Sequence, residues 1–260
     1  MLKVPLATLG NTGLKVSKLG FGTFDFGVPA LNISSEMGGQ ILIESHKLGI
    51  NFWDTAIDYG SHPHVASALN HLPREDVVIS TKAYAESFRE VKKNLKSALK
   101  ELNTDYIDIF LLHYVKHGEV EKCRQILREL NDIKTTGTVK AIGLSTHSVA
   151  VVKEASLFED VDVIMPIYCK ASQELVSKFR KRIPLEDGSI DEMSNAIKLA
   201  HHNGKGVIAM KVLGSGASPL IKDYQLAIKA ILQLDFIDAM VIGMQNFEEV
   251  KKNVEAIISS

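Results

Sequence analysis

Cysteine, excess charge and long apolar runs are all scarce in this chain, and each scarcity excludes a class of protein. Its two cysteines, Cys123 and Cys169, lie far apart without CxxC spacing, which favours a reducing compartment over a disulfide scaffold. Lysine and arginine total 30 against 31 aspartates and glutamates, so there is no basic surplus for nucleic acid or an anionic membrane. The sequence has no signal-peptide core and no run long enough to span a membrane. We therefore expect a cytoplasmic protein without nucleic-acid or membrane partners.

The chain also lacks the glycine-rich turn GxGxxG that is typical of an open, doubly wound dinucleotide-binding sheet. Its 260 residues, 45% of them hydrophobic, suit one large domain or two smaller ones. What it has instead is a series of short apolar runs alternating with amphipathic stretches. The runs predicted as strands are 18–24, 51–56, 77–83, 106–113, 141–146, 162–169, 206–211 and 239–244. The stretches predicted as helices are 35–48, 65–72, 87–102, 119–135, 148–157, 190–203, 219–234 and 246–259.

This alternation predicts a single (β/α)8 TIM barrel over residues 1–260. Strands apolar enough to be buried on both faces are typical of a parallel sheet covered by helices, and eight repeats favour closure into a barrel. Residues 9–17 pair two short extended runs around an Asn-Thr-Gly turn, which predicts a β-hairpin closing the barrel floor. The pattern has no linker or domain boundary.

Four ionisable residues fall at the carboxyl ends of three neighbouring predicted strands, where barrels form their active sites. Asp54 ends the second strand, and Tyr59 lies in the loop behind it. Lys82 ends the third strand and His113 the fourth. A lysine ammonium lowers the pKa of a nearby tyrosine, a carboxylate keeps that lysine charged, and a histidine can orient a substrate oxygen. Each residue alone has an ordinary structural explanation, but the convergence of all four on one rim favours catalysis.

Three motifs around these residues resemble those of the aldo-keto reductases. They are residues 49–60 (GINFWDTAIDYG), 79–83 (ISTKA) and 105–113 (DYIDIFLLH). Residues 9–23, 142–145 and 241–244 follow the same family's pattern, so the resemblance spans nearly the whole chain. It implies that the catalytic tetrad is Asp54, Tyr59, Lys82 and His113. It also implies hydride transfer between a nicotinamide cofactor and a small-molecule carbonyl substrate, with Tyr59 as the proton donor.

The cofactor site is expected across the barrel mouth, because barrels hold phosphate with the loops after strands seven and eight. Glycines in those loops let backbone N–H groups approach an anion, and the last helix adds its positive end. Without the resemblance, both loops would be ordinary turns. Residues expected to contact NADPH or NADH, several of them only by the resemblance, are Gly22, Thr23, Asp54, Ser145, Thr146, Met165, Met210, Leu213, Gly214, Ser215, Gly216, Gly243, Met244, Gln245, Asn246 and Asn253.

The sequence departs from the family at several of these positions. Thr146 stands where many relatives have asparagine, Met165 replaces a carboxamide-binding glutamine, and Met210 replaces the usual aromatic that stacks on the nicotinamide. Met244 and Glu249 stand where NADPH-preferring relatives place a lysine and an arginine around the 2′-phosphate. Because nearby lysines can substitute, the choice between NADPH and NADH stays open.

The substrate pocket is expected to be open and poorly selective. The chain ends directly after its last predicted helix, so we expect a short form without the long C-terminal loop that many relatives fold over the substrate. Candidate pocket walls are Phe24, Trp53, Tyr84 and Tyr114, and the same aromatics could equally be core packing. No feature forces an interface, so we expect a monomer or a weak homo-oligomer.

Two other functions remain open from the sequence. A Schiff-base lyase or aldolase also uses a barrel lysine at a strand end, and Lys82 and Lys211 both have such positions. A slow regulatory or redox-sensing protein that binds the cofactor would carry the same tetrad. No metal site is expected, because two histidine pairs lack a further ligand at suitable spacing, and we interpret both pairs as surface residues. The pairs are His62 with His64 and His201 with His202.

Overall fold

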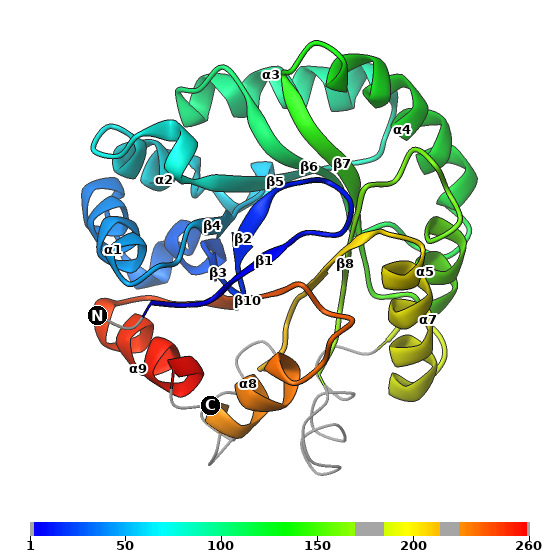
Figure 1. Ribbon diagram of the computed structural model, residues 1–260. Helices are drawn as coiled ribbons and strands as arrows, with labels where there is room; N and C mark the ends of the chain where they lie inside the picture. The colour runs from blue at the N-terminus through cyan, green and yellow to red at the C-terminus, as the bar shows by residue number, and fades with distance from the viewer. Residues whose placement is uncertain (1–2, 170–184, 214–223, 259–260) are drawn as a thin grey trace.

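The computed structural model describes residues 3–169, 185–213 and 224–258. Its centre is a closed barrel of parallel strands in the order β10, β3, β4, β5, β6, β7, β8, β9 (Figure 1). Pairing of Met240 with Leu19 joins β10 to β3 and closes the barrel. Each predicted strand overlaps one observed strand, so the predicted (β/α)8 barrel is confirmed. The strands are β3 (Leu19–Gly22), β4 (Phe52–Asp54), β5 (Val78–Tyr84), β6 (Ile107–His113), β7 (Val139–Thr146), β8 (Val163–Pro166), β9 (Gly206–Ala209) and β10 (Ala239–Gly243).

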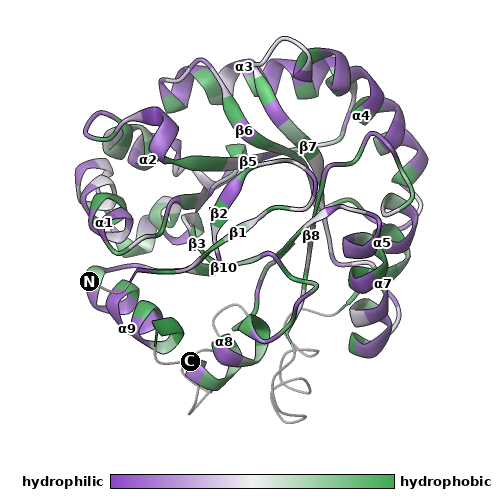
Figure 2. Cartoon of the chain, viewed as in Figure 1, coloured by the Kyte–Doolittle hydropathy of each residue, from purple (hydrophilic) through white to green (hydrophobic). Residues whose placement is uncertain are grey.

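Helices form a ring around the barrel, as Figure 1 shows. They are α1 (Ser35–Lys47), α2 (His62–Leu69), α3 (Phe88–Leu102), α4 (Val120–Lys134), α5 (Val149–Ala155), α7 (Ile190–His202), α8 (Tyr224–Leu232) and α9 (Phe247–Ile258). Figure 2 shows their alternating hydrophilic and hydrophobic stripes. In α3, the buried residues Val91, Leu95 and Leu102 recur at helical spacing. Side chains cap the beginnings of two helices, since Ser148 accepts the Val151 N–H at 3.1 Å and Asn246 accepts the Glu249 N–H at 3.0 Å.

Strand alternation divides the core into two hydrophobic clusters. In β6, Ile109 and Leu111 belong to the cluster inside the barrel, while Phe110 and Leu112 pack with the helices outside it. Successive side chains of a strand point to opposite faces, which produces this division. The same alternation fixes which residues of each strand can reach the barrel mouth.

A hairpin crosses one end of the barrel, and Figure 1 shows it over the strands. It pairs β1 (Leu6–Thr8) with β2 (Lys15–Ser17) in antiparallel register. The predicted hairpin is therefore present, but its first strand lies before the predicted segment 9–17, because six residues rather than three form the loop between the strands. Leu9 is fully buried in the inner cluster, so the hairpin seals the barrel floor.

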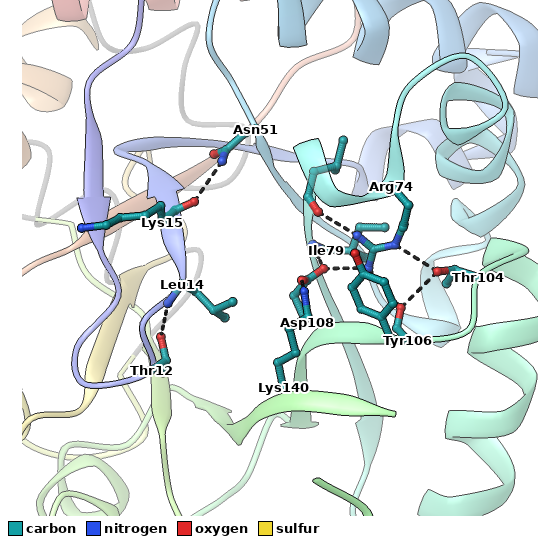
Figure 3. Close-up of polar contacts among 11 residues, drawn as sticks. Thr12, Leu14, Lys15, Asn51, Arg74, Ile79, Thr104, Tyr106, Asp108 and Lys140 are labelled. Carbon is teal, nitrogen blue, oxygen red and sulfur yellow. Dashed lines mark hydrogen bonds and ion pairs between the residues drawn. The ribbon is translucent and has the colours of Figure 1, made fainter. Parts of the chain in front are cut away.

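The barrel floor also holds a buried polar network (Figure 3). Asp108 is almost fully buried, accepts the Ile79 N–H at 3.0 Å and lies 2.6 Å from Arg74 Nη2 and 2.8 Å from Lys140 Nζ. These contacts tie the beginnings of β5, β6 and β7 together. Asp108 belongs to one of the motifs that resemble the aldo-keto reductases, and its contacts give it a structural role.

Candidate active site

The register of the barrel strands brings three of the four predicted catalytic residues to one sector of the mouth. Asp54 pairs with Ser80 across β4 and β5, so Lys82 lies two residues further toward the mouth with the same inward orientation. His113 pairs with Tyr84 at the ends of β6 and β5. The ends of β4, β5 and β6 therefore converge at the mouth, as the sequence predicts.

Asp54 and Lys82 form a buried ion pair at the bottom of the mouth. Lys82 Nζ donates to both Asp54 carboxylate oxygens at 2.8 Å and to the Thr55 carbonyl at 2.6 Å. Their side chains are 6% and 1% exposed. Burial alone would lower the pKa of Lys82, but the Asp54 charge, the Tyr59 hydroxyl and the hydrogen bonds to Asp54 together outweigh it, and the pKa is raised above its ordinary 10.5. Lys82 is therefore a fixed ammonium at any physiological pH.

Tyr59 lies above this pair in a short 3-10 helix, η3 (Ile57–Tyr59). Lys82 Nζ is 4.9 Å from the centroid of the Tyr59 ring. Burial raises the pKa of Tyr59, the Lys82 charge lowers it, the Asp54 charge raises it again, and the net direction is upward. The sequence predicts a lowered pKa for Tyr59; the lysine acts in that direction, but burial outweighs it. Tyr59 therefore keeps its proton at neutral pH.

The Tyr59 loop sits against a glycine of η1 (Phe24–Gly27). A Cβ added at Gly27 would lie 1.5 Å from the Tyr59 carbonyl oxygen, so only glycine lets the two segments approach this closely. The Phe24 ring also packs edge-on against the Tyr59 ring, with centroids 5.1 Å apart. These contacts fix the phenol over Lys82.

His113 lies against two residues, Tyr84 and Asp58, whose contact with it the sequence does not predict. Its ring lies edge-on to Tyr59 with centroids 5.7 Å apart, and Tyr84 stacks on it at 4.9 Å. Asp58 Oδ1 lies 3.0 Å from His113 Nδ1. Burial alone would raise the pKa of Asp58. His113 and Lys82 lower this pKa by more than burial raises it, so the net direction is downward. Its place directly before Tyr59 was the signal that could have revealed Asp58.

The predicted pocket walls divide into three that line the mouth and one that does not. Phe24 and Tyr84 are 55% and 47% exposed, and Tyr114 packs edge-on against His147 with centroids 4.8 Å apart. Trp53 has no exposed surface and packs in the outer cluster between barrel and helices. The prediction for Trp53 is wrong because its neighbour Asp54 points inward, which forces the indole outward.

Comparison with known proteins agrees with this geometry. Residues 18–220 match the model of the Aldo/keto reductase family. The chain belongs to this family. The L-galactose dehydrogenase of Arabidopsis thaliana is 28% identical over 99% of this chain and 89% of its own. The NADH-specific methylglyoxal reductase of Escherichia coli is 26% identical over 99% of this chain and 94% of its own. A solved aldo-keto reductase of Pseudomonas aeruginosa has a TM-score of 0.81 and 25% identity, covering 100% of this chain and 98% of that one.

The hydroxyl groups that the family resemblance assigns to the cofactor also hold the barrel mouth together. Thr23 donates to the Asp54 carbonyl at 3.0 Å, and Ser145 accepts a backbone N–H at 2.9 Å. Thr146 both donates to a backbone carbonyl at 2.7 Å and accepts a backbone N–H at 3.0 Å. Within the described residues, Ser145 thus keeps its hydroxyl proton for a ligand, whereas the hydroxyl of Thr146 is already used. Contact of these groups with a cofactor stays a prediction.

The methionines predicted at the cofactor site differ in exposure. Met165 lies in the inner cluster and Met244 in the outer cluster, both without exposed surface. Met210 is partly exposed and pairs through its backbone with Ile167 at the mouth. Among these three side chains, Met210 is the one that can lie against a bound ring.

The loop after β10 is one of the two loops predicted to bind the cofactor phosphates. The Gln245 N–H donates to Glu249 Oε2 at 2.9 Å, and Asn246 Nδ2 donates to Glu249 Oε1 at 3.4 Å. The Glu249 carboxylate therefore caps the beginning of α9. It accepts hydrogen bonds from the same donors that an anionic ligand would use. Gly243 and Gly22 pair at the ends of β10 and β3. Asn253, predicted at the adenine, is 5% exposed on α9.

Part of the predicted phosphate site lies outside the described residues. Leu213 is the last described residue before that stretch and packs against the outer cluster. Three residues predicted to contact the cofactor, Gly214, Ser215 and Gly216, are not among the residues that the structure describes.

The interpretation of His62 and His64 as surface residues is wrong. His62 is 1% exposed and His64 6%. His62 Nδ1 lies 2.7 Å from Glu101 Oε2, and its Nε2 lies 3.0 Å from Thr81 Oγ1. Over the described ranges, no group of three or more His, Cys, Asp or Glu side chains is arranged to hold a metal ion. None of the described helices combines the length and apolarity needed to cross a membrane.

Proposed function

We propose that this protein reduces a small aldehyde or ketone to the alcohol, with Tyr59 donating the proton. The observation that carries the proposal is the buried Asp54–Lys82 pair beneath a tyrosine whose pKa is raised. At neutral pH this combination keeps a proton on the phenol and a positive charge below it. A nicotinamide cofactor supplies the hydride when bound. A relative covering 99% of the chain is named a methylglyoxal reductase, which supports a small carbonyl substrate.

Each residue has a separate part in the proposed reaction. Tyr59 donates its phenolic proton to the carbonyl oxygen as negative charge develops there. The Lys82 ammonium stabilises the remaining phenolate, and Asp54 holds that ammonium in place. His113 Nδ1 faces Asp58, so its Nε2 is the nitrogen that holds the substrate oxygen.

The experiment that tests this function combines cofactor binding with turnover. We expect NADH or NADPH to change the protein's intrinsic fluorescence on titration, and 4-nitrobenzaldehyde to be reduced at steady state. Tyr59→Phe should lose turnover by about 10²-fold or more, because general acid catalysis contributes that much, while cofactor binding persists. Tyr84→Phe removes a hydroxyl nearby and keeps the ring on His113, so it should lose far less. Turnover by Tyr59→Phe at the wild-type rate would disprove the proton-donor role.

We further propose that the cofactor is NADH rather than NADPH. The carboxylate of Glu249 accepts the Gln245 N–H at the beginning of α9, where the family resemblance expects a 2′-phosphate. A carboxylate repels a phosphate and accepts a hydrogen bond from a ribose hydroxyl. The relative named NADH-specific supports this preference.

Replacement of Glu249 tests the cofactor preference. Removing one repulsive charge is expected to improve NADPH affinity about tenfold in Glu249→Gln, with NADH affinity changed less than threefold. Glu248→Gln, an exposed neighbour on α9, is the control and should change neither. If Glu249→Gln leaves both affinities unchanged, Glu249 does not set the preference.

One observation keeps the Schiff-base alternative open at a single lysine. Lys82 is unsuited to it, because its pKa is raised and its ammonium is held by Asp54. Burial and the Lys82 charge lower the pKa of Lys211, which is the property a nucleophilic amine needs. Borohydride trapping of an aldehyde on Lys211, in a protein that binds neither cofactor, would favour this function over the reductase.

A further inference from the structure

A second cluster of functional groups lies at the mouth beside the tetrad and is not used in the proposed reaction. Lys211 Nζ, just after β9, lies 3.0 Å from His147 Nε2, just after β7. Tyr114 packs edge-on against the His147 ring and directly follows His113 in the chain. Lys82 lowers the pKa of Lys211 and His113 lowers the pKa of His147, so the cluster adjoins the tetrad.

The ammonium of Lys211 has no anionic partner among the described residues. Its side chain is partly buried, and Nζ contacts the neutral imidazole of His147. Burial, Lys211 and His113 lower the pKa of His147 to about 3, so this imidazole is neutral and accepts a hydrogen bond from the ammonium. The other buried lysine of the mouth, Lys82, is matched by Asp54. A partly desolvated ammonium without a carboxylate is costly, and binding an anion removes that cost.

Two residues of this cluster, Lys211 and Tyr114, have an unusual backbone conformation. Lys211 and Tyr114 have φ of +58° and +53°, in the left-handed region that residues with a Cβ seldom adopt. Such conformations persist where the surrounding structure holds them, and they gather at binding and catalytic sites. Here they direct the chain so that both residues border the mouth beside His147.

We propose that Lys211 and His147 form an anion-recognition subsite, which selects carbonyl substrates that carry a carboxylate near the reacting carbon. This inference rests on the proposed reductase function. The ammonium donates a charge-assisted hydrogen bond to the carboxylate, His147 positions the ammonium, and Tyr114 supports the imidazole. The carbonyl group is then presented to Tyr59 in η3 and to His113 at the end of β6.

The test compares matched charged and neutral substrates. With saturating cofactor, kcat/KM is measured for 4-carboxybenzaldehyde against methyl 4-formylbenzoate, and for glyoxylate against glycolaldehyde, which place the carboxylate at long and short reach. The variants are Lys211→Met, which removes the charge at similar length, and Lys211→Arg, which restores it. Lys153→Met, at an exposed lysine of α5, is the control. Cofactor dissociation constants are measured for every variant.

We expect Lys211→Met to lower kcat/KM for at least one carboxylate substrate by about 10- to 100-fold, as loss of a charge-assisted hydrogen bond does. Neutral partners and cofactor binding should change less than threefold, and Lys211→Arg should recover part of the loss. Equal losses on charged and neutral substrates, weakened cofactor binding that accounts for the loss, or a borohydride adduct on Lys211 would each overturn the subsite. Absence of turnover on every aldehyde by the wild type would instead contradict the proposed reductase function.

Discussion

Removal of the Lys82 ammonium is expected to destabilise the protein far more than removal of an ordinary lysine. Lys82→Met deletes three hydrogen bonds, two of them to Asp54, and leaves that carboxylate with 6% exposure and no counter-charge. Breaking a buried pair in this way costs about 3–5 kcal/mol in the free energy of unfolding. The double variant Asp54→Asn with Lys82→Met has no buried charge, so we expect it to recover about 2–3 kcal/mol relative to the sum of the single variants.

Urea unfolding provides the assay, because the chain has one tryptophan, Trp53, which is buried next to Asp54. Its fluorescence and the circular dichroism should give one transition with coincident midpoints. Lys140→Met is the matched control: this lysine pairs with Asp108, which keeps Arg74 as a second partner. Its side chain is 43% exposed, and its loss should cost about 0–1 kcal/mol.

The pH dependence of this coupling follows from the raised pKa of Lys82. Its folded value lies above the ordinary 10.5, so the stabilisation is complete below that pH and is lost only as the pH rises through the folded value. The coupling measured at pH 7 and pH 9 should therefore agree. A cost below about 1 kcal/mol for Lys82→Met, or additive single variants, would refute the buried-pair reasoning.

Two further predictions follow from single contacts. Gly27→Ala puts a methyl group 1.5 Å from the Tyr59 carbonyl oxygen, so kcat should fall by about 10²-fold as the phenol shifts while the circular dichroism spectrum is kept; turnover within twofold of wild type would contradict the contact. The pKa of His147 is lowered from 6.5 to about 3, so the stabilisation by the neutral imidazole is complete above pH 6.5 and is lost as the pH falls toward 3. Between pH 7.5 and 5 this loss amounts to about 2 kcal/mol, measured by urea unfolding. His147→Gln should abolish that part, and an unchanged pH dependence would contradict it, whereas His202→Gln, at an exposed position of α7, should keep it.

The architecture and the clustering of the four residues predicted to be catalytic were predictable because each depends on a local pattern. Every barrel strand is a short apolar run, and each residue predicted to be catalytic lies in or just after one, so strand order alone brings Asp54, Lys82 and His113 together. Alternation along β4 could also have excluded Trp53 as a pocket wall, since Asp54 next to it must face inward.

The remaining features depend on contacts between segments that the sequence does not align. The approach of Gly27 to Tyr59 and the contact of Lys211 with His147 join loops from different strands. The direction of the pKa of Tyr59 depends on how much burial opposes Lys82, a balance of magnitudes that residue type alone does not fix.

Because the hairpin closes the floor, the barrel is open to ligands at its mouth alone. Leu9 of the hairpin loop fills the inner cluster from below, and barrel interiors are packed with side chains rather than hollow. In the proposed reaction, cofactor and carbonyl compound must therefore arrive and depart through the same end. Whichever of them lies deeper has to enter first and leave last, so the closed floor sets the order of binding and release in the proposed reaction.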